Sequence, residues 1–203
     1  MKSETFDPLN PKKLTTSPSM VGASVIGLKY NGGVLLAADR QISYGSYKCQ
    51  KNVDRIFQIS ENTAIASTGE YADATELVDK LRLKHEQDLI AEDGHSFLQP
   101  KDYCTWLARI HYERRNKGNP YWNFHIVGGV NPDGTPFLGS VDLYGTTIQE
   151  NDYLVSGFAN YFCNVLLTNA GDPLSLTEEQ ARDVLNKCYH VLLKADRTQG
   201  NMV

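Results

Sequence analysis

Short runs of alternating apolar and polar residues, early in the chain and again past its middle, predict β-strands. Two of these runs are separated by Asn31-Gly32, which predicts a hairpin because both turn positions tolerate positive φ. The strands expected from this pattern cover residues 24–30, 34–38, 55–59, 63–67, 122–130 and 136–143.

Between and after the strand blocks, apolar residues recur at the three- and four-residue spacing of an amphipathic helix. In the first such stretch Leu77, Val78 and Leu81 fall near one face. The sequence Ser175-Leu176-Thr177-Glu178 has the pattern of a capping box and should begin the last helix. Helices are therefore expected at residues 71–90, 102–116, 158–168 and 178–194.

The order of these elements is strands, two helices, strands and two helices. Such segregated blocks favour an α+β fold over alternating βαβ units. The continuous apolar run from Val34 to Ala38 suits a sheet that is covered on both faces. We therefore expect two stacked sheets between two layers of helices.

Composition and charge limit the classes of protein to which the chain can belong. Its length of 203 residues predicts one domain. Its formal net charge of −4 gives no indication of a nucleic-acid partner. No run of about 18 apolar residues is present, which predicts no transmembrane helix. Residues 1–20 are polar, proline-containing and without the apolar segment of a secretory signal, so we interpret them as an extended or mobile leader before a domain at 21–203.

The cysteines form no CxxC pair and no cluster with histidine, so neither a metal site nor a cofactor is expected. Free thiols in a reducing compartment, buried as small hydrophobic side chains, are the simpler interpretation. The four residues are Cys49, Cys104, Cys163 and Cys188.

Several longer motifs carry a family resemblance. The chain resembles the β-type subunits of the eukaryotic proteasome core particle, which belong to the N-terminal nucleophile hydrolase superfamily, from about residue 18 to 196. The general family motifs match GGVLLAAD, YGS and the loop GEYAD before the first helix. The stretches RRNKGNPYWN, FLGSVDLYG, GEYADA and EDGHS resemble most the seventh β-type subunit, a non-catalytic member.

This resemblance implies a four-layer αββα sandwich of the N-terminal nucleophile hydrolase type. It also implies a place in a heptameric ring, with other β subunits beside it and an α ring and a second β ring stacked against it. Neither a nucleic acid nor a membrane is implied as a partner. The location implied is the cytoplasm and the nucleus.

Active members of the family use the hydroxyl of an N-terminal threonine as the nucleophile and its freed amine as the base. The matching position here is Ala23, after Gly22. A methyl group can neither attack a carbonyl nor drive self-cleavage. The resemblance therefore implies an inactive member of a threonine protease family, a structural subunit needed for ring assembly and for ubiquitin-dependent protein degradation by the complex.

Other positions of the family's active site are partly retained. Asp39 matches the active-site aspartate, but the position of its lysine partner is Arg55, so we expect a buried structural ion pair; the alternative is that Asp39 only caps a strand end. Gly69 matches the glycine of the oxyanion hole, and we expect it to serve a tight strand-to-helix turn. Ser156 and Asp196 lie near the family's supporting serine and aspartate, and we assign them no catalytic role.

The alternative function is an active N-terminal nucleophile hydrolase with a displaced nucleophile. Ser24 follows the nucleophile position but should face the other side of its strand, and Thr15 and Thr16 lie in the leader without a preceding glycine. His95 and His125 have no identifiable serine or cysteine partner and are interpreted as loop or packing residues. A third hypothesis is a free-standing binding module that has lost both the activity and the ring.

The segment RRNKGNPYW at 114–122 combines residue types that are enriched in interfaces, namely Arg114, Tyr121 and Trp122. We interpret it as a contact loop; the alternative is a solvated helix end with Trp122 in the core. Family chains continue past the last helix with further strands. Because this chain stops at Val203, we expect those strands to be missing through truncation, since their loss would otherwise leave sheet edges unpaired.

Overall fold

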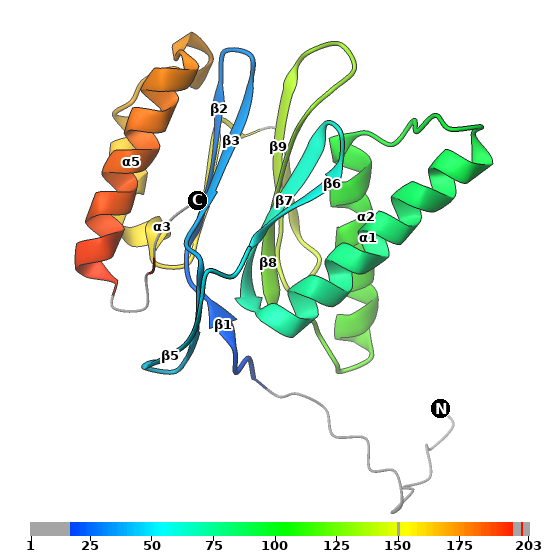
Figure 1. The fold of residues 1–203 in the computed structure, drawn as a ribbon, viewed down its shortest axis with the longest axis horizontal. Helices are drawn as coiled ribbons and strands as arrows, with labels where there is room; N and C mark the ends of the chain where they lie inside the picture. The colour runs from blue at the N-terminus through cyan, green and yellow to red at the C-terminus, as the bar shows by residue number, and fades with distance from the viewer. Residues whose placement is uncertain (1–16, 150, 197–199, 201–203) are drawn as a thin grey trace, which may run out of the picture.

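Two β-sheets stack face to face between two layers of helices (Figure 1). The structure is a computed structural model that describes residues 17–149, 151–196 and 200. The predicted α+β fold and its four-layer αββα arrangement are confirmed. Thr15 and Thr16 lie outside the described residues.

The larger sheet is antiparallel throughout, with the strand order β10-β9-β8-β7-β1-β4-β5 and with β6 paired to β7. Its long central strands β7 and β8 pair in register from Thr63 opposite Gly129 to Gly69 opposite Asn123. Its strands are β1 (Val21–Gly22), β4 (Gln41–Tyr44), β5 (Tyr47–Lys51), β6 (Ile56–Ser60), β7 (Thr63–Glu70), β8 (Asn123–Val130), β9 (Pro136–Val141) and β10 (Thr147–Gln149).

The smaller sheet contains the predicted hairpin. Its order is β11-β2-β3, with β2 (Val25–Tyr30), β3 (Gly33–Ala38) and β11 (Tyr153–Ser156), all antiparallel. Gly32 in the hairpin turn has φ +114°, a conformation that glycine adopts without steric cost. The turn predicted at Asn31-Gly32 is therefore confirmed.

Helices cover the outer face of each sheet (Figure 1). Helices α1 (Tyr71–Ala91) and α2 (Pro100–Asn116) pack on the larger sheet. On the smaller sheet lie α3 (Ala159–Phe162), α4 (Asn164–Thr168) and α5 (Glu178–Ala195), the last preceded by a 3₁₀ turn η1 (Pro173–Ser175).

Each gap between layers holds its own apolar cluster. Leu77 and Leu107 belong to the cluster beneath α1 and α2, and Leu185 to the cluster beneath α5. Val25 and Ile126 meet between the two sheets. Because both faces of each sheet are covered, continuous apolar strands such as β3 are stable here, as the sequence predicted.

Two details of the helix predictions were wrong. The capping box of α5 is formed by Thr177 and Gln180, because Ser175 is already part of the preceding 3₁₀ turn. The single helix expected at 158–168 is divided into α3 and α4 at Cys163.

Candidate functional site

A pocket of about 420 Å³ opens beside Ala23, the position where the family's nucleophile was expected. It lies where the chain before β2 meets the end of β7 and the start of α3. Among the described residues that line it, none carries an ionisable side chain. The lining residues are Pro18, Ser19, Val21, Gly22, Ala23, Ser43, Gly45, Thr68, Gly69, Gly157 and Phe158.

Arg55 lies behind this pocket and forms a buried ion pair with Asp39. All five N–H donors of the guanidinium are used, one of them on the Asp39 carboxylate. Nε donates to the carbonyl oxygen of Asp39 at 2.9 Å. The terminal nitrogens donate to the carbonyl oxygens of Ala23 at 3.2 Å, Ser67 at 3.3 Å and Ser24 at 2.9 Å. One side chain thus connects the nucleophile position with Ser24 just before β2, Asp39 just after β3 and Ser67 in β7.

The expected structural ion pair is confirmed, and the alternative that Asp39 only caps a strand end is wrong. Burial raises the pKa of Asp39, while Arg55 and the backbone N–H groups of Gly200 and Gln41 oppose that shift. Burial lowers the pKa of Arg55, and Asp39 opposes this shift. A guanidinium nonetheless stays protonated in the physiological range, so the pair carries structure and moves no proton.

Gly22 is required because of this ion pair. A Cβ atom at Gly22 would lie 2.3 Å from Nη1 of Arg55, and that side chain is fixed by its five hydrogen bonds. The glycine that precedes the self-cleavage site in active relatives therefore has a packing role in this chain.

Gly69 is the penultimate residue of β7, which continues directly into α1, and it has φ +91°. A Cβ atom there would lie 1.9 Å from the carbonyl oxygen of Trp122, which is backbone and cannot move aside. Its predicted role in a tight strand-to-helix turn is confirmed. Gly69 lines the pocket, but the nucleophile position in the same pocket is occupied by Ala23, which has no reactive group.

The chain that leads into the pocket is held by Glu70. One carboxylate oxygen of Glu70 accepts hydrogen bonds from the backbone N–H of Ser19 at 2.6 Å and of Met20 at 3.1 Å. Val21 and Gly22 then pair with both β4 and β7. The last two residues of the predicted extended or mobile leader, Ser19 and Met20, are thus hydrogen-bonded to the end of β7.

The hydroxyl groups near the pocket have no base beside them. Ser24 does not line the pocket, and its Oγ accepts the backbone N–H of Ala159 at 3.1 Å. Thr68 and Ser156 share a hydrogen bond of 3.1 Å between their hydroxyls. Asp196 is buried at the end of α5, where its charge raises the pKa of Asp39. No described contact gives Ser156 or Asp196 a catalytic role.

A serine–histidine contact that sequence reasoning missed lies inside the larger sheet. Ser67 Oγ is 2.8 Å from Nδ1 of His125, because the two residues are directly opposite on β7 and β8. Both side chains are buried, and burial lowers the pKa of His125 well below its ordinary value. A substrate cannot reach this pair, so His125 is a packing residue as predicted. His95 is exposed in the loop after α1.

The prediction of a contact loop at 114–122 fails at Tyr121, one of the three residues on which it was based. Tyr121 is 0% exposed and belongs to the cluster beneath α1 and α2. Its hydroxyl accepts a hydrogen bond from Lys80 at 2.6 Å and donates one to Glu76 at 2.8 Å. Arg114 stacks 4.5 Å from the centre of its ring. Tyr121 therefore anchors the segment to α1 from within.

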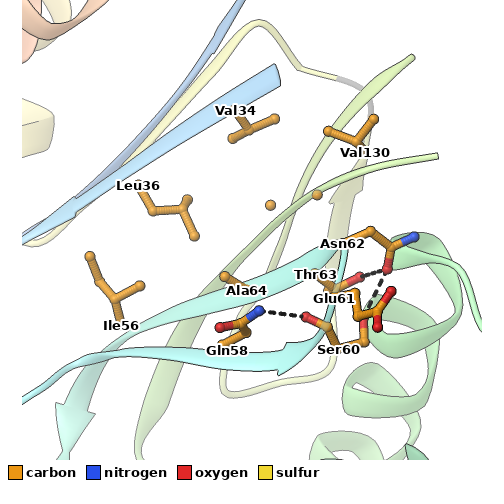
Figure 2. A pocket seen from close by; sticks show the side chains of 12 residues that line it. Val34, Leu36, Ile56, Gln58, Ser60, Glu61, Asn62, Thr63, Ala64 and Val130 are labelled. Carbon is orange, nitrogen blue, oxygen red and sulfur yellow. Dashed lines mark hydrogen bonds between the residues drawn. The ribbon is translucent and has the colours of Figure 1, made fainter. Parts of the chain in front are cut away.

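A second hollow of about 490 Å³ lies between the two sheets at the far end of the sandwich. Figure 2 shows Val34 and Leu36 of β3 across from Ile56 of β6, with polar side chains at one side. Among its described lining residues, Glu61 is the one ionisable group, and the Ser60 hydroxyl donates to Asn62. The Ser60 hydroxyl is bonded to an amide oxygen and not to a base, so we assign this hollow no catalytic chemistry.

Within the described residues, no cluster of three histidine, cysteine, aspartate or glutamate side chains could hold a metal ion. None of the described helices combines the length and the hydropathy that a bilayer crossing requires.

Comparison with known proteins identifies what the chain is similar to. Residues 20–203 match the family described as proteasome subunit. Proteasome subunit beta type-4 of Xenopus laevis is 36% identical over 200 residues, which cover 97% of this chain and 80% of that protein. Proteasome subunit beta type-4 of Arabidopsis thaliana is 36% identical over 92% of this chain and 74% of its own length. Proteasome subunit beta type-7 of Saccharomyces cerevisiae is 35% identical over 92% of this chain and 73% of its own length.

Proposed function

The chain belongs to the proteasome subunit family, as one of its β-type members, and on this premise we propose that it is a non-catalytic subunit of the core particle. In this proposal it completes a heptameric β ring that contacts an α ring and a second β ring. Degradation of ubiquitin-tagged proteins is then carried out by other subunits of the complex. We place it in the cytoplasm and the nucleus, as the family resemblance implies.

The pocket beside Ala23 carries the proposal. It combines a methyl group at the nucleophile position with a lining that has no described ionisable side chain. The attacking hydroxyl of the family mechanism is therefore missing from the nucleophile position, and no described lining side chain can act as a base. Arg55 supports the same conclusion, because its five donors are all engaged with backbone carbonyls and Asp39.

Restoring the hydroxyl alone should not create activity. In Ala23→Thr the amine of the new threonine would still lie in the peptide bond to Gly22, and Arg55 would still stand at the position of the family's lysine. We expect no peptidase turnover above background when this variant is assembled into particles whose native active subunits are inactivated. Peptidase assays on the purified particle provide the measurement.

Ala23→Val is the matched control, because valine has the shape of threonine without its hydroxyl. Equal background rates for the two variants would support the proposal. Turnover in the threonine variant and none in the valine variant would favour the alternative, an active N-terminal nucleophile hydrolase site. A covalent adduct of the unmodified chain with a hydroxyl-reactive electrophile would do the same for a displaced nucleophile.

The surface of α3 and α4 supports the ring part of the proposal. The segment 157–171 contains no charged residue. Its inner side packs on α5, while Phe158, Tyr161, Phe162 and Val165 are exposed on the outer side. A helical segment that exposes four large apolar side chains and no charge is typical of one covered by a partner, since interface cores are depleted of charge.

Two charges on this surface should block assembly. Tyr161 and Val165 are 79% and 64% exposed, so Tyr161→Asp with Val165→Asp should leave the isolated chain folded. An unpaired charge buried at a dry interface costs several kcal/mol, so the yield of assembled particle should fall by about tenfold or more. Native gels and native mass measurements report that yield.

The control is Ile90→Asp, because Ile90 is 81% exposed on α1 in the opposite helical layer. It adds a charge to an exposed apolar position without touching α3 or α4. An undiminished particle yield for the double variant would exclude this surface as an interface. A native mass of one chain for the unmodified protein, in the presence of its neighbours, would favour the hypothesis of a free-standing module.

A further inference from the structure

Two cysteines meet in the helical layer over the smaller sheet. Cys163 stands at the break between α3 and α4, and Cys188 lies within α5. The Cys163 thiol donates a hydrogen bond to the carbonyl oxygen of Cys188 at 3.8 Å, and both side chains belong to the same apolar cluster. The break at Cys163 thus places one thiol directly against the other helix.

The surroundings keep this pair apart from water and from the other two cysteines. Both side chains are 0% exposed, in a cluster with Ala159, Leu167 and Leu192. Neither thiol has a role in the pocket beside Ala23 or in the ion pair behind it. The pair is therefore unused by anything described above.

The two thiols are unequal, because the Cys163 S–H is held by the carbonyl oxygen of Cys188. The neighbouring Cys188 and burial both raise the pKa of Cys163. The neighbouring Cys163 lowers the pKa of Cys188. Because the thiolate is the reactive form of cysteine, Cys188 is the side chain to be oxidised first and Cys163 is the resolving thiol.

We propose that Cys163 and Cys188 are a redox-modification site that closes into a disulfide when the protein meets a peroxide. The contact of the Cys163 thiol with Cys188, inside one buried cluster, carries this proposal. It does not depend on the proposed role in the proteasome ring.

The chemistry balances with a peroxide as the oxidant. The Cys188 thiolate attacks one peroxide oxygen, the O–O bond breaks, and a sulfenic acid forms while hydroxide leaves and takes up a proton. The Cys163 thiol then attacks the sulfenic sulfur, so that the S–S bond forms, the S–O bond breaks and water departs. For hydrogen peroxide, two thiols and one oxidant give one disulfide and two waters.

Access requires local opening, because neither thiol is exposed. Helices α3 and α4 have four and five residues, and each ends at or beside Cys163. Such short helices belong to the part of a structure that opens at low free-energy cost. A small peroxide can therefore enter where a larger disulfide reagent is excluded. The closed disulfide would tie α3 and α4, with their exposed apolar side, to α5.

The test is peptide mapping of the full chain after treatment with hydrogen peroxide, without reducing agent. We expect the peptides that contain Cys163 and Cys188 to be joined, with the loss of two hydrogen atoms from the intact mass and reversal by dithiothreitol. The oxidised chain should also unfold at a higher temperature, because a disulfide restricts the unfolded chain.

The chain supplies its own control in Cys104. That thiol is equally buried, and burial raises its pKa to about 11, but it has no described cysteine beside it. Cys104→Ser should therefore leave the cross-link intact, while Cys188→Ser should abolish it and Cys163→Ser should leave Cys188 free to oxidise further. An unchanged intact mass, a cross-link through Cys49, or sulfinic acid at Cys188 in the unmodified chain would each overturn the proposal.

Discussion

Replacing Arg55 by methionine should destabilise the protein by about 3–5 kcal/mol, because Asp39 would be left buried without its counter-charge. The change also leaves the carbonyl oxygens of Ala23, Ser24 and Ser67 without the hydrogen bonds they now accept from the guanidinium. Methionine retains much of the length of arginine, so lost packing is a small part of the effect. Urea unfolding of the isolated chain measures the change in free energy of unfolding.

Two further variants make this prediction specific. Arg55→Lys keeps the charge but offers three donors for five acceptors, so its loss should be smaller than that of methionine. Arg55→Met with Asp39→Asn removes both charges and should recover part of the stability that the single methionine change loses. A loss below about 1 kcal/mol for Arg55→Met, the size of an exposed ion pair, would contradict the structural role proposed here.

The long elements could be predicted from the sequence, and most of the short strands could not. Apolar periodicity located α1 and α5 to within a few residues, because each buries one regular face, and the apolar runs on either side of Asn31-Gly32 located β2 and β3. Strands β1, β4, β5, β10 and β11 were missed. They have two to five residues, and β5 has the sequence YKCQK, so their conformation depends on pairing with neighbours.

The sequence predicted those parts of the candidate site that could be matched, position by position, to the family motifs. Ala23, Arg55 and Asp39 were placed correctly relative to one another because the family motifs around them are retained. The carbonyl oxygens around the guanidinium could not be foreseen, since backbone acceptors carry no residue signature. The contact of Ser67 with His125 joins residues that are 58 positions apart, and only the register of β7 and β8 brings them together.

The segment 114–122 shows why residue type alone is a poor guide to an interface. Tyrosine and arginine are enriched in binding surfaces, but they are also the side chains that pair an apolar body with a polar end. Here the ring of Tyr121 fills the core while its hydroxyl reaches Lys80 and Glu76 on α1. Those partners are 41 and 45 residues away, so no local pattern reveals them.

Tyr121→Ala should therefore be among the most destabilising substitutions in the chain, at about 3–5 kcal/mol, which is the usual cost of deleting a buried aromatic ring. The ring is enclosed by the apolar cluster between the larger sheet and α1 and α2, which cannot collapse fully into the space. Urea unfolding of the isolated chain measures the loss. A double change of Arg114 and Tyr121 to alanine should destabilise the chain further, because it also removes the guanidinium from the face of the ring.

The separate contributions of this residue can be resolved with two milder variants. Tyr121→Phe keeps the ring and loses the hydrogen bonds to Lys80 and Glu76, so it should cost about 1 kcal/mol. Arg114→Ala removes a half-exposed cation from the face of the ring and should cost about 0.5–1 kcal/mol. Tyr121→Ala could instead prove as stable as Tyr121→Phe and Arg114→Ala while particle assembly fails. That result would place Tyr121 at a subunit contact and would contradict its burial in the core.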